Sequence, residues 1–152
     1  IVPDLTIKDV QVNKDNVLIL PGSDSWSESE NFRILEIAKR FLEVGGLVTA
    51  ICGATVALAN IGILDNKKHT SNGAGFLNMF CPEYKGIDHY IDKSAVRDEN
   101  LITAASTGAL DMARLILEYL DLFATDTLEH WYAYFSTGNA NEFFDMMQSL
   151  QK

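Results

Sequence analysis

Cysteine is scarce in this sequence, which has only Cys52 and Cys81 among its 152 residues. A domain of this size that depended on disulfides would hold several pairs, so the count argues against an extracellular disulfide scaffold and favours a reducing, cytoplasmic compartment. Long apolar runs are missing as well, since none approaches the roughly 20 residues that a membrane-spanning helix needs. We therefore expect a protein without a membrane segment or a membrane partner.

Basic residues are also few. Lys and Arg number 12 against 21 Asp and Glu, which gives a formal net charge of −9. Basic residues never cluster beyond two neighbours, as at Lys39-Arg40 and Lys67-Lys68. Such a chain is a poor partner for nucleic acid or an anionic membrane. Its apolar fraction of 47% is enough for one core, so residues 1–152 are expected to form a single domain.

Short apolar runs alternate with amphipathic stretches along most of the chain. Val17 to Leu20 is apolar on both faces and is followed by Pro-Gly, which is typical of a buried parallel strand. A helix is predicted from near Phe32 to Gly45-Gly46, then a strand over 47–51 and a helix over 54–61. This alternation predicts an α/β fold with a mostly parallel sheet and helices on both faces.

The second half of the chain is less regular. Residues 67–72 are predicted as a short strand or loop, and 73–80 as a brief helix before Pro82. A turn at 98–100 leads to a core strand over 101–104, which an apolar helix over 109–120 follows. The aromatic run 131–135 and a final amphipathic helix with Phe143, Phe144, Met147 and Leu150 could form a dimer surface or a pocket wall, but such stripes more often cover the core.

Cys52 lies in the segment Ala50-Ile51-Cys52-Gly53-Ala54, between a predicted strand and a predicted helix. A nucleophile on such a sharp turn has small neighbours that let the strand and the helix approach each other. The unpaired N–H groups of the helix N-terminus favour a thiolate and can face a developing oxyanion. The alternative is a small buried residue that merely suits a tight turn. Cys81 precedes a proline without a charged neighbour, so we expect it to be structural.

Several motifs follow one another in a familiar order. They are LILPGS at 18–23, AICGA at 50–54, GIL at 62–64 with HTSN at 69–72, and NLITA at 100–104. Together they resemble the DJ-1/PfpI superfamily, and more narrowly its PfpI-like intracellular protease/amidase group, which is also described as class I glutamine amidotransferase-like. The resemblance runs from Ile1 to about Leu120, which leaves 121–152 as a C-terminal helical extension.

The resemblance implies a flavodoxin-like three-layer sandwich, commonly a homodimer, with Cys52 as nucleophile and the backbone N–H groups of Gly22 and Gly53 as oxyanion donors. Protease-like members place a histidine directly after the cysteine, where this chain has Gly53. The family glutamate that hydrogen-bonds the cysteine would lie before Ile1. We therefore expect that an N-terminal strand-helix-strand portion is absent from this chain, or stays bound to it as a separate piece.

Two further residues are candidates for the site. His69 could act as a general base if its imidazole reached Cys52, although on a strand its ring could equally point the other way and be structural. Asn72 could orient the thiolate or hold a substrate carbonyl, or its side chain could cap the helix predicted to begin at Gly73. His89 and His130 each adjoin an acid without further ligands at helical spacing, so we expect no metal and no cofactor.

These features predict a cysteine-dependent hydrolase-like enzyme that acts on an amide, an ester or a small carbonyl compound. Because no histidine follows Cys52, peptidase activity is disfavoured, and a glyoxalase or deglycase-like reaction on reactive aldehydes is the alternative. A third possibility is a stress-response protein that senses oxidants through oxidation of Cys52.

Overall fold

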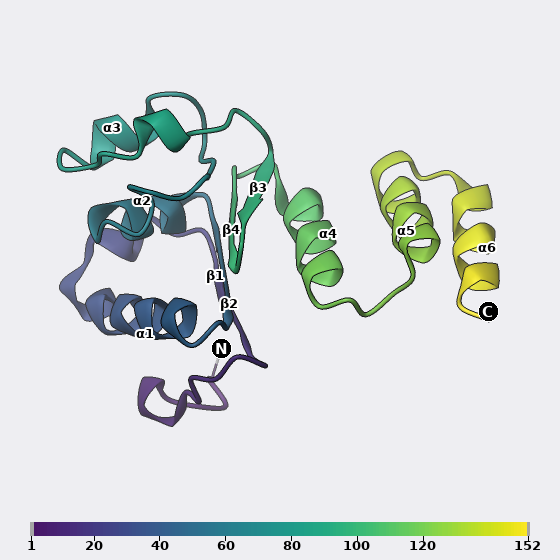
Figure 1. The fold of residues 1–152 in the computed structure, drawn as a ribbon, viewed down its shortest axis with the longest axis horizontal. Helices are drawn as coiled ribbons and strands as arrows, with labels where there is room; N and C mark the ends of the chain where they lie inside the picture. Colours follow the sequence, from purple (N-terminus) through teal and green to yellow (C-terminus); the bar gives the residue numbers. More distant parts are fainter. Residues whose placement is uncertain (1, 152) are drawn as a thin grey trace.

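A four-stranded sheet with helices on both sides forms the body of the molecule in the computed structural model, which describes residues 2–151 (Figure 1). The strand order is β1-β2-β4-β3, with β1 (Val17–Leu20), β2 (Leu47–Ile51) and β4 (Leu101–Ala104) parallel to one another. The strands predicted over 17–20, 47–51 and 101–104 are confirmed. The expected flavodoxin-like α/β architecture with a mostly parallel sheet is therefore confirmed too.

The antiparallel edge strand β3 (Ala95–Asp98) was not foreseen as a separate strand. It pairs with β4 from Ala95 opposite Ala104 to Asp98 opposite Leu101. The tight connection puts Glu99 at a φ of 52°, within the turn that the sequence predicts at 98–100. The predicted strand or loop over 67–72 forms only an isolated bridge between His69 and Tyr90.

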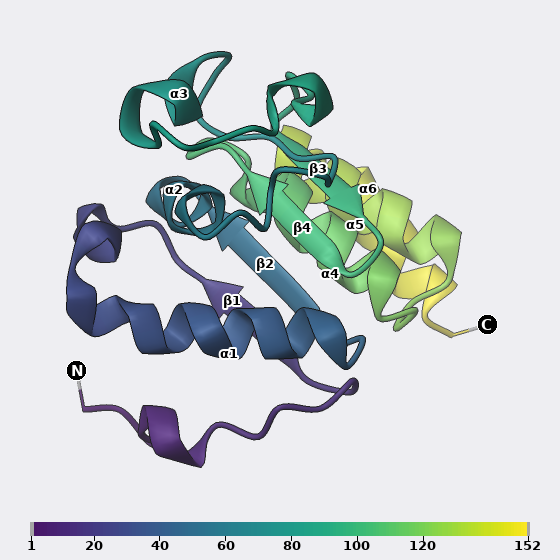
Figure 2. The same ribbon diagram turned by 60° about the vertical axis from the view of Figure 1, so that its left-hand side comes forward.

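Helices lie on both faces of the sheet, and the last two helices lie beyond one of these layers (Figures 1 and 2). Their bounds are α1 (Phe32–Glu43), α2 (Gly53–Asn60), α3 (Phe76–Phe80), α4 (Ala109–Tyr119), α5 (Thr125–Thr137) and α6 (Ala140–Ser149). Four short 3-10 helices complete the secondary structure: η1 (Ile7–Asp9), η2 (Asp24–Ser27), η3 (Ser29–Asn31) and η4 (Ile87–His89). The helix predicted over 73–80 is thus shorter than expected.

Each face of the sheet has its own apolar core. The core on the α1 and α2 side includes Leu20, Val48, Leu35 and Leu58, all at most 2% exposed. On the α4 side, a smaller cluster joins Leu47, Ile102 and Met112, which shows that the fold has three layers. Burial of this kind stabilises a fold by about 25 cal/mol per Å² of apolar surface.

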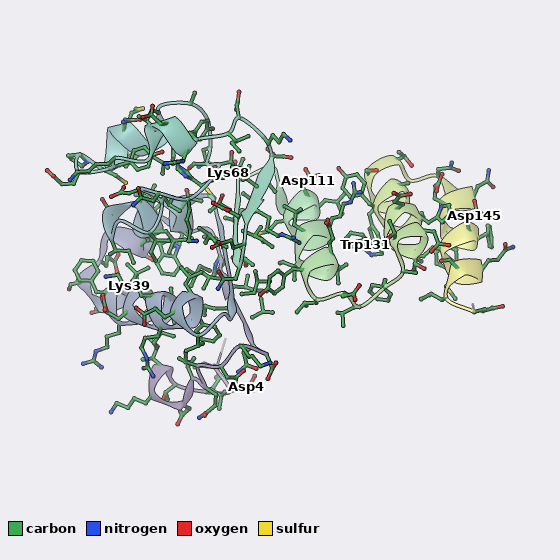
Figure 3. The ribbon with its side chains drawn as sticks, viewed as in Figure 1. Asp4, Lys39, Lys68, Asp111, Trp131 and Asp145 are labelled. Atoms are coloured by element: carbon green, nitrogen blue, oxygen red, sulfur yellow. The ribbon has the colours of Figure 1, made fainter. Side chains whose placement is uncertain are left out.

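The C-terminal helices α5 and α6 extend away from the sheet beyond α4 (Figure 1). Figure 3 shows the same arrangement through labelled side chains, with Lys39 on α1 and Asp145 on α6 at opposite sides of the molecule. The expectation that the aromatic stripe covers the core is wrong, because Phe144 is 62% exposed and Leu150 is 51% exposed. The physical reason is that α6 packs mainly on α5 and does not reach the sheet.

The strand β1 has one sheet edge that no described strand covers, and its Ile19 is 53% exposed. The further strand-helix-strand portion that the resemblance implies stays a prediction. Among residues 2–151, no helix is both long enough and apolar enough to cross a membrane.

Candidate active site

Cys52 occupies the junction between β2 and α2 in a backbone conformation that side chains rarely adopt. Its φ is 57° and its ψ is −125°, and it is the N-cap of α2. A non-glycine residue in such a region costs of the order of 1–3 kcal/mol and persists only where its surroundings hold it. Two backbone bonds do so: the Cys52 N–H donates to Ala104 O of β4 at 3.0 Å, and the Thr55 N–H donates to Cys52 O at 3.0 Å.

Two glycines permit the close packing around this turn. A Cβ on Gly53 would lie 2.1 Å from the carbonyl oxygen of Ser23, and a Cβ on Gly22 would lie 3.0 Å from Cys52 Cβ and 3.7 Å from its Sγ. Only glycine therefore lets the loop after β1 lie against the start of α2. Gly53, as the first residue of α2, has an N–H without an acceptor inside the helix. The backbone of Gly22 and Gly53 thus lies beside Cys52, and their role as oxyanion donors stays a prediction.

The side chain of Asn72 hydrogen-bonds the thiol. Its Nδ2 donates to Cys52 Sγ at 3.4 Å, while its Oδ1 accepts from the Ser106 N–H at 2.8 Å. Because a backbone N–H can only donate, the Ser106 bond fixes the amide orientation and turns Nδ2 toward sulfur. Of the two readings of Asn72, thiolate orientation fits this geometry. The capping alternative does not, because α3 begins at Phe76 with Gly75 as its N-cap.

A buried hydroxyl pair holds the Asn72 segment against the elbow. Thr55 Oγ1 lies 2.6 Å from Cys52 O and 2.7 Å from Ser71 Oγ. Thr55 is fully buried and Ser71 is 2% exposed, so neither hydroxyl is bonded to bulk water. The arrangement ties α2, the elbow and the residue next to Asn72 together, and no local pattern in the sequence indicates these roles of Thr55 and Ser71.

His69 lies in the same segment but its ring is engaged elsewhere. The ring is fully buried, with Nδ1 2.6 Å from Lys67 O and Nε2 2.6 Å from the Tyr84 hydroxyl. A carbonyl only accepts, so Nδ1 carries the proton and Nε2 accepts from Tyr84. Both ring nitrogens are thus occupied. The geometry fits the structural reading of His69 and not the base reading.

Burial, the largest cause, lowers the pKa of His69, and burial raises the pKa of Tyr84 to about 12. As the pH falls below about 6.5, the unfolded chain binds a proton at this position that the folded chain resists. We therefore predict that His69 makes the protein lose stability on acidification through this range. Denaturant unfolding of wild type and His69→Gln at several pH values measures this effect. The free energy of unfolding of the wild type should exceed that of the variant by less and less as the pH falls. Parallel curves would contradict this assignment.

Cys81 differs from Cys52 in its burial and in its hydrogen-bond partner. It is 1% exposed, its Sγ donates to Val56 O at 3.4 Å, and burial raises its pKa to about 11. A thiol in this state holds very little thiolate near neutral pH. Cys52 is half-buried by comparison. The structural reading of Cys81 fits, and this residue serves as an internal control for experiments on Cys52.

The structure groups possible metal ligands at the α5–α6 hairpin that sequence spacing did not reveal. His130 of α5 lies with Glu142 and Asp145 of α6, their ligand atoms all within 4.8 Å of one another. Nδ1 of His130 is 2.8 Å from Glu142 Oε2, and this hydrogen bond is the largest cause that raises the pKa of His130. The ion pair accounts for the grouping, because it joins the two helices at the surface, and no metal is assigned.

Comparison with known proteins gives a family match over most of the chain. Residues 1–119 match the model described as the DJ-1/PfpI family. The chain is 40% identical over 150 residues to the uncharacterized protease YoaZ of Bacillus subtilis, covering 99% of this chain and 71% of that protein. It is 33% identical over 124 residues to the glutathione-independent glyoxalase DJR-1.2 of Caenorhabditis elegans, covering 80% and 63%.

The fold has close relatives among solved structures. A thiJ/pfpI family protein from Bacillus anthracis superposes with a TM-score of 0.95 at 42% identity, covering 98% of this chain and 70% of that chain. The DJ-1 superfamily protein Atu0886 from Agrobacterium tumefaciens superposes with a TM-score of 0.78 at 30% identity, covering 91% and 73%. The helices beyond residue 119 thus fall within the matched part of the first structure.

Proposed function

The chain belongs to the DJ-1/PfpI family, and from this premise we propose that it is a hydrolase-like enzyme whose Cys52 thiolate attacks the carbonyl carbon of an ester, amide or small carbonyl compound. The observation that carries the proposal is the elbow itself. A cysteine in a strained backbone conformation receives a hydrogen bond from Asn72 and lies beside two glycines. A charged sulfur accepts such a hydrogen bond more strongly than a neutral thiol does.

With an ester, the sulfur forms a bond to the carbonyl carbon, and the carbonyl oxygen takes up negative charge facing the Gly22 and Gly53 backbone. The bond to the leaving oxygen then breaks, and its electron pair departs with the alcohol. Water attacks the resulting thioester, which releases the carboxylic acid and frees the thiolate. The sum is one ester and one water converted to one acid and one alcohol.

The residues around Cys52 favour substrates with a good leaving group. Gly53 stands where a histidine would protonate a departing amine, and both nitrogens of His69 are engaged by other groups. An activated ester needs no such proton because its leaving group, such as p-nitrophenolate, is a weakly basic anion that departs unaided. We therefore rank esters above peptides as substrates.

The second candidate is a glyoxalase-like reaction on reactive aldehydes. The relative DJR-1.2 carries the name of a glyoxalase, which favours this candidate. Addition of the thiolate to an aldehyde forms a hemithioacetal and expels no group, so it too proceeds without a histidine after Cys52.

Acylation by p-nitrophenyl acetate tests the proposal directly. We predict a burst of p-nitrophenolate and a mass increase of one acetyl group, mapped by peptide mass analysis to Cys52 and not to Cys81. The physical reason is the contrast between a hydrogen-bonded, half-buried thiol and a deeply buried thiol whose pKa is raised to about 11. An adduct at Cys81, or none at all, would reject the nucleophile assignment. If peroxide alone modified Cys52, the oxidant-sensor reading would take its place.

A further inference from the structure

An apolar groove begins beside the nucleophile and follows α2 away from it. Its first part is a cavity of about 340 Å³ that starts at Ser23 and Gly53, the two residues that pack together at the elbow. The cavity continues past Val56 to Asn60, which share one face of α2 with Gly53 because helical residues three and four apart are neighbours. The groove therefore starts at the elbow, at the residue that follows Cys52 in the chain, while Cys52 itself does not line it.

Aromatic rings form much of the wall of this first cavity. Phe76 and Phe80 of α3 lie on one side, with ring centroids 4.9 Å apart, and Trp26 of η2 also lines it. Trp26 Nε1 donates to Pro21 O at 2.8 Å, which fixes the indole to the loop that carries Gly22. Phe80 remains 53% exposed, so a large apolar surface is available to a ligand.

A second cavity of about 370 Å³ continues the groove. It shares Trp26, Ser27 and Asn60 with the first, and it extends between α1 and α2 along Leu35 and Ile61. Together the two cavities follow one side of α2 from Gly53 to Asn60, and the helix of eight residues is about 12 Å long at 1.5 Å per residue. Asn60 lies at their junction and is exposed.

The composition of the groove indicates what it accepts. Its side chains are mostly apolar, and the charged groups that line it, Asp24 in the first part and Glu36 in the second, are both acidic. Asp24 disfavours an anionic tail, and Glu36 is already paired with Lys39 Nζ at 3.1 Å, so a neutral chain is the better occupant. Because Ser23 and Gly53 of the elbow line the first cavity, a chain that occupies the groove would direct the carbonyl group joined to it toward the elbow.

We propose that this groove is an acyl subsite, which binds the neutral medium-length alkyl chain of an ester whose carbonyl carbon is attacked by Cys52. The assignment rests on the proposed function and names its substrate class. Burial of one methylene raises specificity by up to about fourfold. The octanoate ester should therefore react with a kcat/KM at least about tenfold above that of the acetate ester, since only part of the added chain needs to be buried.

The test compares p-nitrophenyl acetate, butyrate and octanoate, each below its aggregation limit. In Asn60→Trp, an indole at the junction of the two cavities should block the far part and lower the octanoate-to-acetate ratio several-fold. Asn78→Trp is the matched control, because Asn78 is exposed on α3 and lines neither cavity, and it should keep the wild-type ratio. Equal octanoate-to-acetate ratios of kcat/KM in Asn60→Trp and Asn78→Trp would overturn the proposal of an acyl subsite.

A binding measurement keeps the proposal testable without catalysis. The chain has two tryptophans, so Trp131→Phe leaves Trp26 as the sole fluorescent indole in the groove. Octanamide should change its emission and acetamide should not. If acetate acylates Cys52 but chain length affects neither kcat/KM nor Trp26 emission, the acyl subsite is wrong and the proposed function stands. If no ester acylates Cys52, the proposed function fails, and the substrate role of the groove fails with it.

Discussion

Replacing Cys52 by serine should lower the turnover of p-nitrophenyl esters by about 10³-fold or more, because loss of the nucleophile removes the covalent step that the rest of the site serves. Serine keeps the size of the side chain and the Asn72 donor still faces it. Its hydroxyl, however, is far harder to deprotonate than a thiol, and both ring nitrogens of His69 are engaged by Lys67 O and the Tyr84 hydroxyl, so this imidazole does not serve as its base. Steady-state p-nitrophenolate release measures the effect.

Cys81→Ala is the matched control for that experiment. Cys81 is buried against Val56 O, so its removal costs some packing but should leave turnover near the wild-type value. Circular dichroism and thermal unfolding should show both variants folded. If Cys52→Ser kept most of the activity, or Cys81→Ala lost it, the assignment of the nucleophile would be wrong.

Gly53→Ala should damage both the fold and the site. The new Cβ would lie 2.1 Å from the carbonyl oxygen of Ser23, and this neighbour is backbone that cannot rotate away. Overpacking lowers the free energy of unfolding by up to about 3 kcal/mol in typical cases. For a domain of this size, such a loss lowers Tm by roughly 6–12 °C. If the loop after β1 moved away from the start of α2, the Gly22 backbone would also move away from the thiol. We therefore expect acylation of Cys52 to fall together with stability.

Gly45→Ala is the control for Gly53→Ala, because it introduces backbone strain without a steric clash. Gly45 has a φ of +82°, yet a Cβ there would meet nothing within 4 Å. It should cost about 1–2 kcal/mol through the left-handed conformation alone and leave acylation of Cys52 unchanged. Unfolding in urea and the acylation burst should be measured on both variants. If Gly53→Ala were as mild as Gly45→Ala in both, close approach of Ser23 and Gly53 would not be required.

The sequence predicted the parts of the fold that depend on local chain properties. The strands at 17–20, 47–51 and 101–104 are continuous apolar runs bounded by turn residues, and both the runs and their boundaries can be read locally. The small residues around Cys52 likewise pointed to a sharp turn before a helix. By contrast, the sequence indicates α5 (Thr125–Thr137) only as an aromatic run, because a helix that packs on other helices outside the sheet has no simple apolar stripe.

What the sequence determined by itself is the sharp turn at Cys52, because the apolar strand, the turn residues and the following helix are contiguous in the chain. Only the tertiary structure decided which side chain faces the thiol. Asn72 and His69 are three residues apart in an irregular segment, where orientation depends on long-range bonds to Ser106 for one and to Tyr84 for the other. The groove along α2 is likewise a product of packing, since η2, α2 and α3 are brought together by burial and not by any local pattern.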